Sequence, residues 1–139
     1  MIKNDFHGKA VLITGGTKGI GLATGLAFGR HGAQVYLTHK WGSADEDAIR
    51  AQFAEAGAPE PSIHEADVAD KGDTKALFET LKSQHEGLEV FVSNVAFAQV
   101  TGDLEGYKKR SLLTSLGYTA WPFVGYLQQI KKTFGSFPR

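Results

Sequence analysis

The chain has no cysteine and no net charge, and these two absences exclude several classes of protein. Without cysteine it forms no disulfides and no thiolate sites, which fits a cytoplasmic protein without requiring one. Basic and acidic residues both number 15, so net charge favours neither nucleic acid nor a membrane surface as a partner. No apolar stretch approaches the ~20 residues of a membrane span, and residues 1–7 lack a signal-peptide core. The five scattered histidines lack metal-binding spacing. We expect a globular cytoplasmic protein with no metal site.

The 139 residues have the length of one ordinary domain, and we expect residues 1–139 to form one unit. Strands are expected at 10–13, 34–38, 62–66 and 88–92. Helices are expected at about 20–31, 46–56 after a Ser43–Glu46 capping box, 71–86 after an Asp70 cap, and 104–134 with an interruption near Pro122. This alternation predicts an α/β fold with a doubly wound parallel sheet. Because no strand follows the last helical region, we expect a sheet truncated after its fourth strand and following helix.

A glycine-rich turn follows the first expected strand. Residues 14–21 read T-G-G-T-K-G-I-G and lead into a segment with apolar residues at helical spacing. Glycine permits positive φ and lets a ligand approach the backbone without a Cβ in between. The first N–H groups of the helix then point at the ligand, where the helix dipole favours an anion. The turn therefore predicts a diphosphate-binding loop, although its G-x-x-x-G-x-G spacing differs from the general G-x-G-x-x-G fingerprint.

The T-G-x-x-x-G-I-G string resembles the cofactor loop of the short-chain dehydrogenase/reductase family. Members of that family transfer hydride between NAD(P)H and carbonyl, hydroxyl or enoyl groups. The resemblance covers nearly all of this chain but only about the first half of a typical member, and it implies a Rossmann-type fold. It also implies that the diphosphate and nearby ribose are bound by Gly15, Thr17, Lys18, Gly19, Ile20 and Gly21.

The end of the second strand bears on the choice between NAD and NADP. An acidic residue there would bond the adenosine ribose hydroxyls, whereas a basic residue would favour a 2′-phosphate. His39 stands where NAD-preferring relatives carry aspartate, and Lys40 follows it. Lys18 adds a cation where NADP-preferring relatives often have arginine or lysine. The resemblance therefore implies NADP(H) over NAD(H), with Lys40 on the 2′-phosphate.

Two further segments match parts of the family pattern. Asp67 and Val68 resemble the pair whose carboxylate and backbone N–H contact the adenine ring. Residues 93–96 read S-N-V-A where the family usually has N-N-A-G, so Asn94, Val95 and Ala96 are expected beside the adenosine ribose. The S-N-V-A-F-A run is closer to enoyl-acyl-carrier-protein reductases, a divergent branch that lacks the glycine loop seen here. An enoyl reductase is therefore an alternative.

The family's chemistry also needs a tyrosine acid, a lysine four residues later and a serine on the preceding strand. A nearby cation lowers the pKa of a phenol, and a four-residue spacing brings the two groups together on a helix. The one match here joins Tyr36 to Lys40 on an expected strand, where that spacing separates side chains. Ser115 falls near the place of the family's water-holding asparagine and is the one candidate catalytic residue. The catalytic serine, tyrosine and lysine are expected beyond Arg139.

Three functions remain open at this point. The first is an NADP(H)-dependent oxidoreductase acting on a small carbonyl or enoyl substrate, as a homodimer or homotetramer like its relatives. The second is a non-catalytic module that binds NADP. The third is a structural α/β unit whose exposed sheet edge needs a partner.

Overall fold

The structure is a computed structural model that describes residues 5–42 and 44–138. Four strands form one parallel sheet in the order β3-β2-β1-β4: β1 (Ala10–Thr14), β2 (Gln34–His39), β3 (Ser62–Glu65) and β4 (Val90–Ser93). Five helices accompany them: α1 (Gly19–Arg30), α2 (Glu46–Glu55), α3 (Lys71–Gln84), α4 (Lys109–Thr119) and α5 (Trp121–Phe134). The predicted α/β class and Rossmann-type parallel sheet are confirmed.

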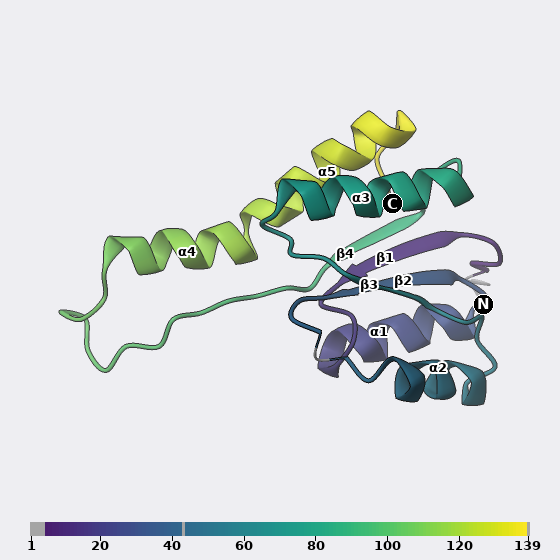
Figure 1. The fold of residues 1–139 in the computed structure, drawn as a ribbon, viewed down its shortest axis with the longest axis horizontal. Coiled ribbons are helices and arrows are strands. Elements are labelled where there is room, and N and C mark those ends of the chain that lie inside the picture. The colour runs from purple at the N-terminus through teal and green to yellow at the C-terminus, as the bar shows by residue number, and fades with distance from the viewer. Residues whose placement is uncertain (1–4, 43, 139) are drawn as a thin grey trace.

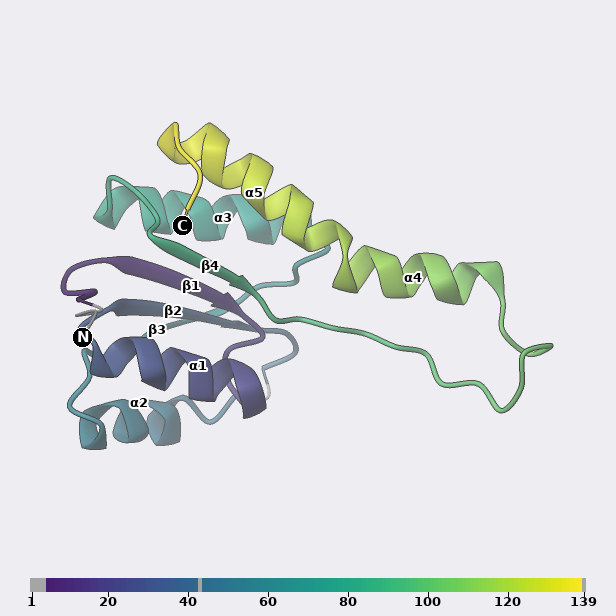
Figure 2. The same cartoon turned by 180° about the vertical axis from the view of Figure 1, so that it is seen from behind.

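Helices cover both faces of the sheet. α1 and α2 lie on one face and α3 and α5 on the other, as the two opposite views show (Figures 1 and 2). Alternate residues of β1 enter two separate cores: Val11 and Ile13 pack on the α1–α2 side, whereas Ala10 and Leu12 pack on the α3–α5 side. A parallel strand with both faces covered is apolar throughout, which explains the uninterrupted apolar run in β1.

The helix boundaries differ from expectation in three places. Ser43, predicted to cap α2, lies outside the described residues, and Asp45 caps this helix by accepting a hydrogen bond from Ala48 N–H at 3.1 Å. The predicted Asp70 cap of α3 is confirmed, but that helix ends at Gln84 and not near Gly87. The last helical region begins at Lys109 instead of residue 104.

The interruption near Pro122 is confirmed. α4 and α5 meet at Ala120, and Pro122 lies in the first turn of α5. The first turn of a helix has N–H groups without intrahelical partners, so a proline there sacrifices no hydrogen bond.

α4 and the preceding segment 94–108 project away from the sheet, as both opposite views show (Figures 1 and 2). The backbone N–H of Phe97 donates to Thr119 Oγ1 at 3.0 Å, and that hydroxyl donates back to Phe97 O at 3.2 Å, so the start of this segment is bound to the last turn of α4. The loop and the helix therefore form one extension beside the carboxyl ends of the strands.

Candidate cofactor site

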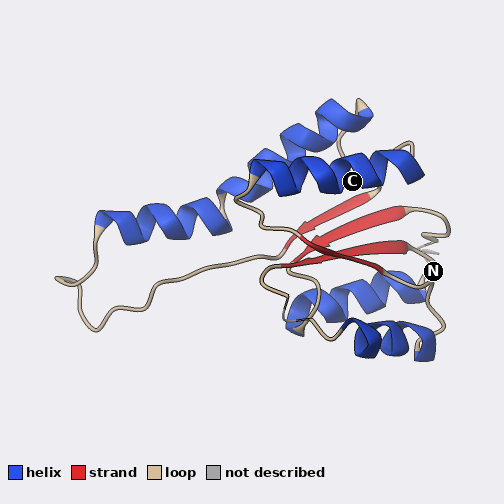
Figure 3. Ribbon diagram, in the orientation of Figure 1, coloured by secondary structure: helices blue, strands red, loops and turns tan. Residues whose placement is uncertain are grey.

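The predicted cofactor residues lie at one edge of the sheet. All four strands are parallel, so their carboxyl ends point the same way (Figure 3). The glycine loop follows β1, Lys40 follows β2, Asp67 comes two residues after β3, and Asn94 follows β4. In open α/β sheets, ligands bind outside this edge where the strand order reverses, which here is between β1 and β4.

The loop after β1 has the backbone that a close ligand requires. Gly15 and Gly19 have φ angles of +63° and +55°, which residues with a Cβ rarely adopt. A Cβ on Gly19 would meet no atom within 4 Å, so the space in front of it is open. At Gly21 a Cβ would overlap Gly15 O and lie 2.9 Å from Gly16 Cα. The loop is thus closed against α1 but open toward solvent, and this cradle fits a diphosphate.

The N-terminus of α1 has no acceptor of its own. Its N-cap residue, Lys18, makes no side-chain capping bond, and the first turn contains no acidic residue. By contrast, Asp45 caps α2 and Asp70 caps α3. The first N–H groups of a helix need acceptors from outside it. α4 and α5 also lack side-chain caps, but only α1 begins in the glycine cradle, where an anion can approach.

Asn94 joins the end of β4 to the glycine loop. Its side-chain Nδ2 donates to Gly15 O at 2.9 Å, and its backbone N–H donates to Thr14 Oγ1 at 3.2 Å. On the other side of the loop, Gly16 N–H donates to Thr38 O at 2.9 Å. The loop is therefore held by both neighbouring strands before any ligand binds, which reduces the entropy lost on binding.

Lys40 contacts three side chains near the carboxyl end of β2. Its Nζ lies 2.6 Å from Asp67 Oδ2 and donates to Tyr118 Oη at 3.0 Å. The same ammonium lies 4.4 Å from the ring centroid of Trp41 and 4.8 Å from that of Tyr118. Two predicted cofactor residues, Lys40 and Asp67, are thus brought together by the fold.

The pKa values of this pair reflect their contact. The hydrogen bond to Asp67 raises the pKa of Lys40 most, and the hydrogen bond to Tyr118 raises it further. Lys40 therefore stays protonated. Burial disfavours the charged form of Asp67, but the hydrogen bonds from Lys40 and from Ala69 N–H outweigh it and lower the pKa of Asp67. Both groups are therefore charged at neutral pH.

Other predicted residues differ in exposure. His39 is 9% exposed, and its buried Nδ1 has no hydrogen-bond partner in the described part of the chain. An unpaired buried polar atom is destabilising by about 1–3 kcal/mol, so a ligand hydroxyl at this atom would be favourable. The Val68 side chain lies in the α3–α5 core, which leaves only its backbone for a ligand. Ile20 and Ala96 are exposed, whereas Val95 is half-buried and its Cγ2 lies close to Gly15.

Sequence reasoning missed Tyr118 and Trp41 as neighbours of Lys40. Tyr118 is 78 residues from Lys40 along the chain, and no local spacing predicts such a contact. Trp41 is adjacent to Lys40, so the Lys-Trp pair after a strand was a usable signal.

Comparison with known proteins identifies the family. A sequence profile for short chain dehydrogenases matches residues 9–114, which is most of the chain. This chain belongs to the short-chain dehydrogenase family. Glucose 1-dehydrogenase of Gluconobacter oxydans is 37% identical over 99 residues, and D-beta-hydroxybutyrate dehydrogenase of Cupriavidus necator is 30% identical over 95 residues. Both alignments cover 68% of this chain but only 35% and 36% of those relatives, so this short-chain dehydrogenase sequence spans about a third of their length.

Solved structures of short-chain dehydrogenases share the fold. A metagenomic short-chain oxidoreductase in complex with NADP gives a TM-score of 0.80 at 22% identity, over 92% of this chain and 57% of that one. The NADH-dependent reductase A1-R′ complexed with NAD gives 0.77 at 23% identity, over 99% of this chain and 59% of that one. At these identities the likeness shows the Rossmann-like fold alone.

The described tyrosines do not reproduce the catalytic acid of this family. Burial raises the pKa of Tyr36 and of Tyr126, which is opposite to the change that an acid–base tyrosine needs. Tyr36 Oη also donates to Gln84 Oε1 at 2.6 Å, so the Tyr36–Lys40 sequence match forms no pair. Tyr118 accepts its hydrogen bond from Lys40, which follows β2 and is not part of the glycine loop after β1.

Ser115, the candidate catalytic residue, lies in α4 one turn before Tyr118. Its Oγ is buried without a hydrogen-bond partner among the described residues. Among the described residues it forms no hydrogen bond to the glycine loop, so its catalytic role stays a prediction.

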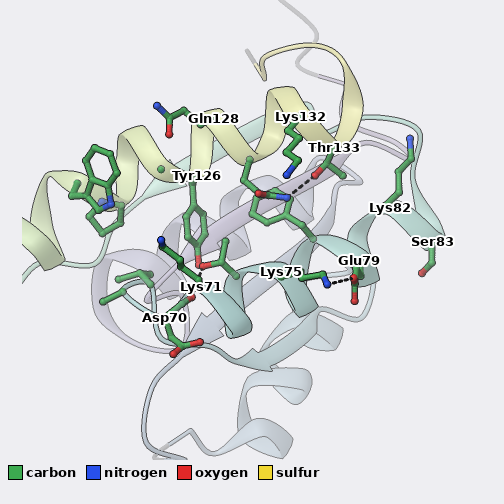
Figure 4. Close-up of a pocket in the computed structure, with 18 residues that line it drawn as sticks. Asp70, Lys71, Lys75, Glu79, Lys82, Ser83, Tyr126, Gln128, Lys132 and Thr133 are labelled. Atoms are coloured by element: carbon green, nitrogen blue, oxygen red, sulfur yellow. Dashed lines mark hydrogen bonds and ion pairs between the residues drawn. The ribbon is translucent and has the colours of Figure 1, made fainter.

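A separate groove of about 970 Å³ lies between α3 and α5 (Figure 4). Val68 is the one predicted cofactor residue in its lining, and Lys71, Lys75, Lys82 and Lys132 also line it. The groove therefore does not contain the glycine cradle. Over residues 5–42 and 44–138, no helix is long and apolar enough to span a membrane, and no cluster of three metal-ligating side chains occurs.

Proposed function

We propose that this chain is the cofactor-binding part of an NADP(H)-dependent oxidoreductase of the short-chain dehydrogenase type. The observation that carries the proposal is the glycine cradle, which opens into an uncapped helix N-terminus. That cradle fits the diphosphate of a nicotinamide dinucleotide; Asn94 holds the cradle from the β4 side, and Asp67 lies beside Lys40 on the β2–β3 side. When bound, the nicotinamide would supply hydride to a carbonyl or hydroxyl substrate.

Lys40 supports NADP(H) over NAD(H). A lysine ammonium has three N–H donors, and Asp67 and Tyr118 account for two acceptors, which leaves one donor for a phosphate. The residue before it, His39, carries no carboxylate that would repel a 2′-phosphate. Each charge-assisted hydrogen bond contributes about 1.5–3 kcal/mol. The 2′-phosphate should therefore gain about 10- to 100-fold in affinity from Lys40.

The test compares NADPH and NADH binding by calorimetry for the chain and its Lys40→Gln variant. We expect NADPH to bind at least about tenfold more tightly, and Lys40→Gln to weaken NADPH by about 10- to 100-fold while NADH changes little. Lys75→Gln is the matched control, because Lys75 is exposed and also pairs with an acid, Glu79, at 3.7 Å. Equal affinity for the two cofactors, or no binding of either, would refute the proposal.

A non-catalytic NADP-binding module is the second candidate. It is favoured by the sequence, in which no Tyr-x-x-x-Lys falls on a helix, so the oxidoreductase proposal needs an acid from outside residues 1–139. Oxidation of NADPH with a panel of carbonyl and enoyl compounds separates the two. Binding without oxidation by the whole protein would favour the module, and activity on enoyl compounds alone would favour the enoyl reductase.

The proposed oxidoreductase functions as a homodimer or homotetramer. α4 exposes three leucines along the extension, Leu112, Leu113 and Leu116, each about half exposed. Exposed apolar side chains grouped on one helix favour association with another surface.

A further inference from the structure

Trp41 is an aromatic side chain in an unusual position. It follows β2 directly after Lys40, and its side chain is 79% exposed. Its φ angle is +66°, and it is the one non-glycine residue with positive φ in residues 5–42 and 44–138. A left-handed backbone at a bulky residue is unfavourable and persists only where the surroundings or a function require it. A single exposed tryptophan would by itself need no explanation, but the ring of this one is in contact with a charged neighbour.

That neighbour is Lys40, which the proposed function places at the adenosine end of the cofactor site. The Lys40 ammonium lies 4.4 Å from the Trp41 ring centroid and 2.6 Å from Asp67 Oδ2. The indole is therefore held beside Lys40, which the proposed function assigns to the 2′-phosphate and which itself pairs with Asp67, assigned to the adenine. Since the side chain is mostly exposed, a large part of its ring surface is available to a ligand.

The chemistry of such a surface suits a purine. Nucleobases stack on aromatic side chains whatever their hydrogen-bond pattern, and tryptophan offers the largest ring. The base and the 2′-phosphate of NADP are attached to the same ribose. A residue adjacent to the phosphate-binding cation can therefore reach the base.

We propose that Trp41 is the adenine platform of the cofactor site and that its indole stacks on the base while Lys40 contacts the 2′-phosphate. This inference rests on the proposed NADP(H) function. It adds a specificity-determining residue: the Lys40–Trp41 pair recognises a purine nucleotide phosphorylated on the 2′-hydroxyl. Tyr118, whose ring contacts the same ammonium, completes the wall around Lys40.

The two tryptophans of the chain allow a direct spectroscopic test. Trp121 begins α5 and lines the groove between α3 and α5, so it serves as an internal control. In Trp121→Phe, all tryptophan emission comes from Trp41, and we expect adenosine 2′,5′-bisphosphate to quench it saturably. In Trp41→Phe, where only Trp121 emits, the same ligand should cause little change.

Affinity provides the second readout. We expect Trp41→Gly to weaken binding of adenosine 2′,5′-bisphosphate by about 5- to 100-fold in calorimetry. Glycine accepts a φ of +66°, so this variant keeps the turn and should fold. Trp41→Phe, which retains an aromatic face, should recover most of the affinity, and Trp121→Gly should bind like the parent chain.

The outcomes distinguish the two proposals. If Trp41→Gly binds adenosine 2′,5′-bisphosphate as tightly as the parent, the stacking role is wrong and the proposed function stands. If the parent chain binds NADPH but not this ligand, the platform is refuted and the proposed function stands; if it binds neither, both are refuted. Quenching of Trp41 without loss of affinity in Trp41→Gly would also overturn the platform, because proximity alone would explain it.

Discussion

Gly21 is the residue at which the structure makes its sharpest stability prediction. In Gly21→Ala, the new Cβ would overlap Gly15 O and lie 2.7 Å from Asn94 Nδ2 and 2.9 Å from Gly16 Cα. Two of these three atoms are backbone, so no side-chain rotation relieves the overlap. The loop between β1 and α1 must shift, and with it the hydrogen bond from Asn94 to Gly15 O.

The magnitude follows from two opposing effects. Overpacking typically destabilises by about 1–3 kcal/mol, and we expect the upper part of that range because the obstacle is backbone. Replacing glycine by alanine within a helix stabilises by about 1 kcal/mol. The net loss in the free energy of unfolding should therefore be about 1–2 kcal/mol.

Gly117→Ala provides the matched control. Gly117 also lies inside a helix, α4, but a Cβ there would meet no atom within 4 Å. That variant should be stabilised by about 1 kcal/mol, so the two alanine variants should differ by about 2–3 kcal/mol. With a urea slope of about 1.5 kcal/mol per molar, their unfolding midpoints should be separated by about 1.3–2 M.

The assay is urea denaturation followed by circular dichroism, with NADPH binding as a second readout. A Gly21→Ala midpoint at or above that of Gly117→Ala would refute the close contact between the loop and α1. Unchanged NADPH affinity in Gly21→Ala would refute the role of the loop as the diphosphate cradle.

Two further predictions concern the residues that hold the site. Asn94→Ala removes the bond to Gly15 O and should lower the free energy of unfolding by about 0.5–1.5 kcal/mol in urea denaturation, and an unchanged midpoint would contradict the bond. Asp67→Asn tests the ion pair with Lys40 through pH. Because the fold lowers the pKa of Asp67, the pair stabilises above the unfolded pKa of about 3.9 and is lost as the pH falls through the lower folded value. The variant should therefore be less stable than the parent at pH 7, with a gap that closes below about pH 4. A gap independent of pH would show that the pair contributes nothing.

Much of the fold could be predicted from the chain because its signals are local. The apolar run before T-G-G-T-K-G-I-G, the Asp70 cap and the break near Pro122 each depend on residues within a few positions of one another. The ends of the helices are less well determined by local signals. Asp45 caps α2, and because serine and aspartate accept hydrogen bonds from a helix N-terminus equally well, residue type alone does not choose the cap.

The candidate site also has features that the sequence predicts and features that only the tertiary structure shows. The sequence by itself determined which residues follow each strand, and the parallel sheet then required them to share an edge. Only the tertiary structure decided how they meet: Lys40 pairs with Asp67 and Tyr118, and Asn94 holds the glycine loop. These contacts join residues 27 to 79 positions apart, whose spacing along the chain has no relation to their distance in space. The burial of His39 and Val68 and the exposure of Trp41 likewise depend on how α3, α5 and the turn after β2 pack, which no local pattern encodes.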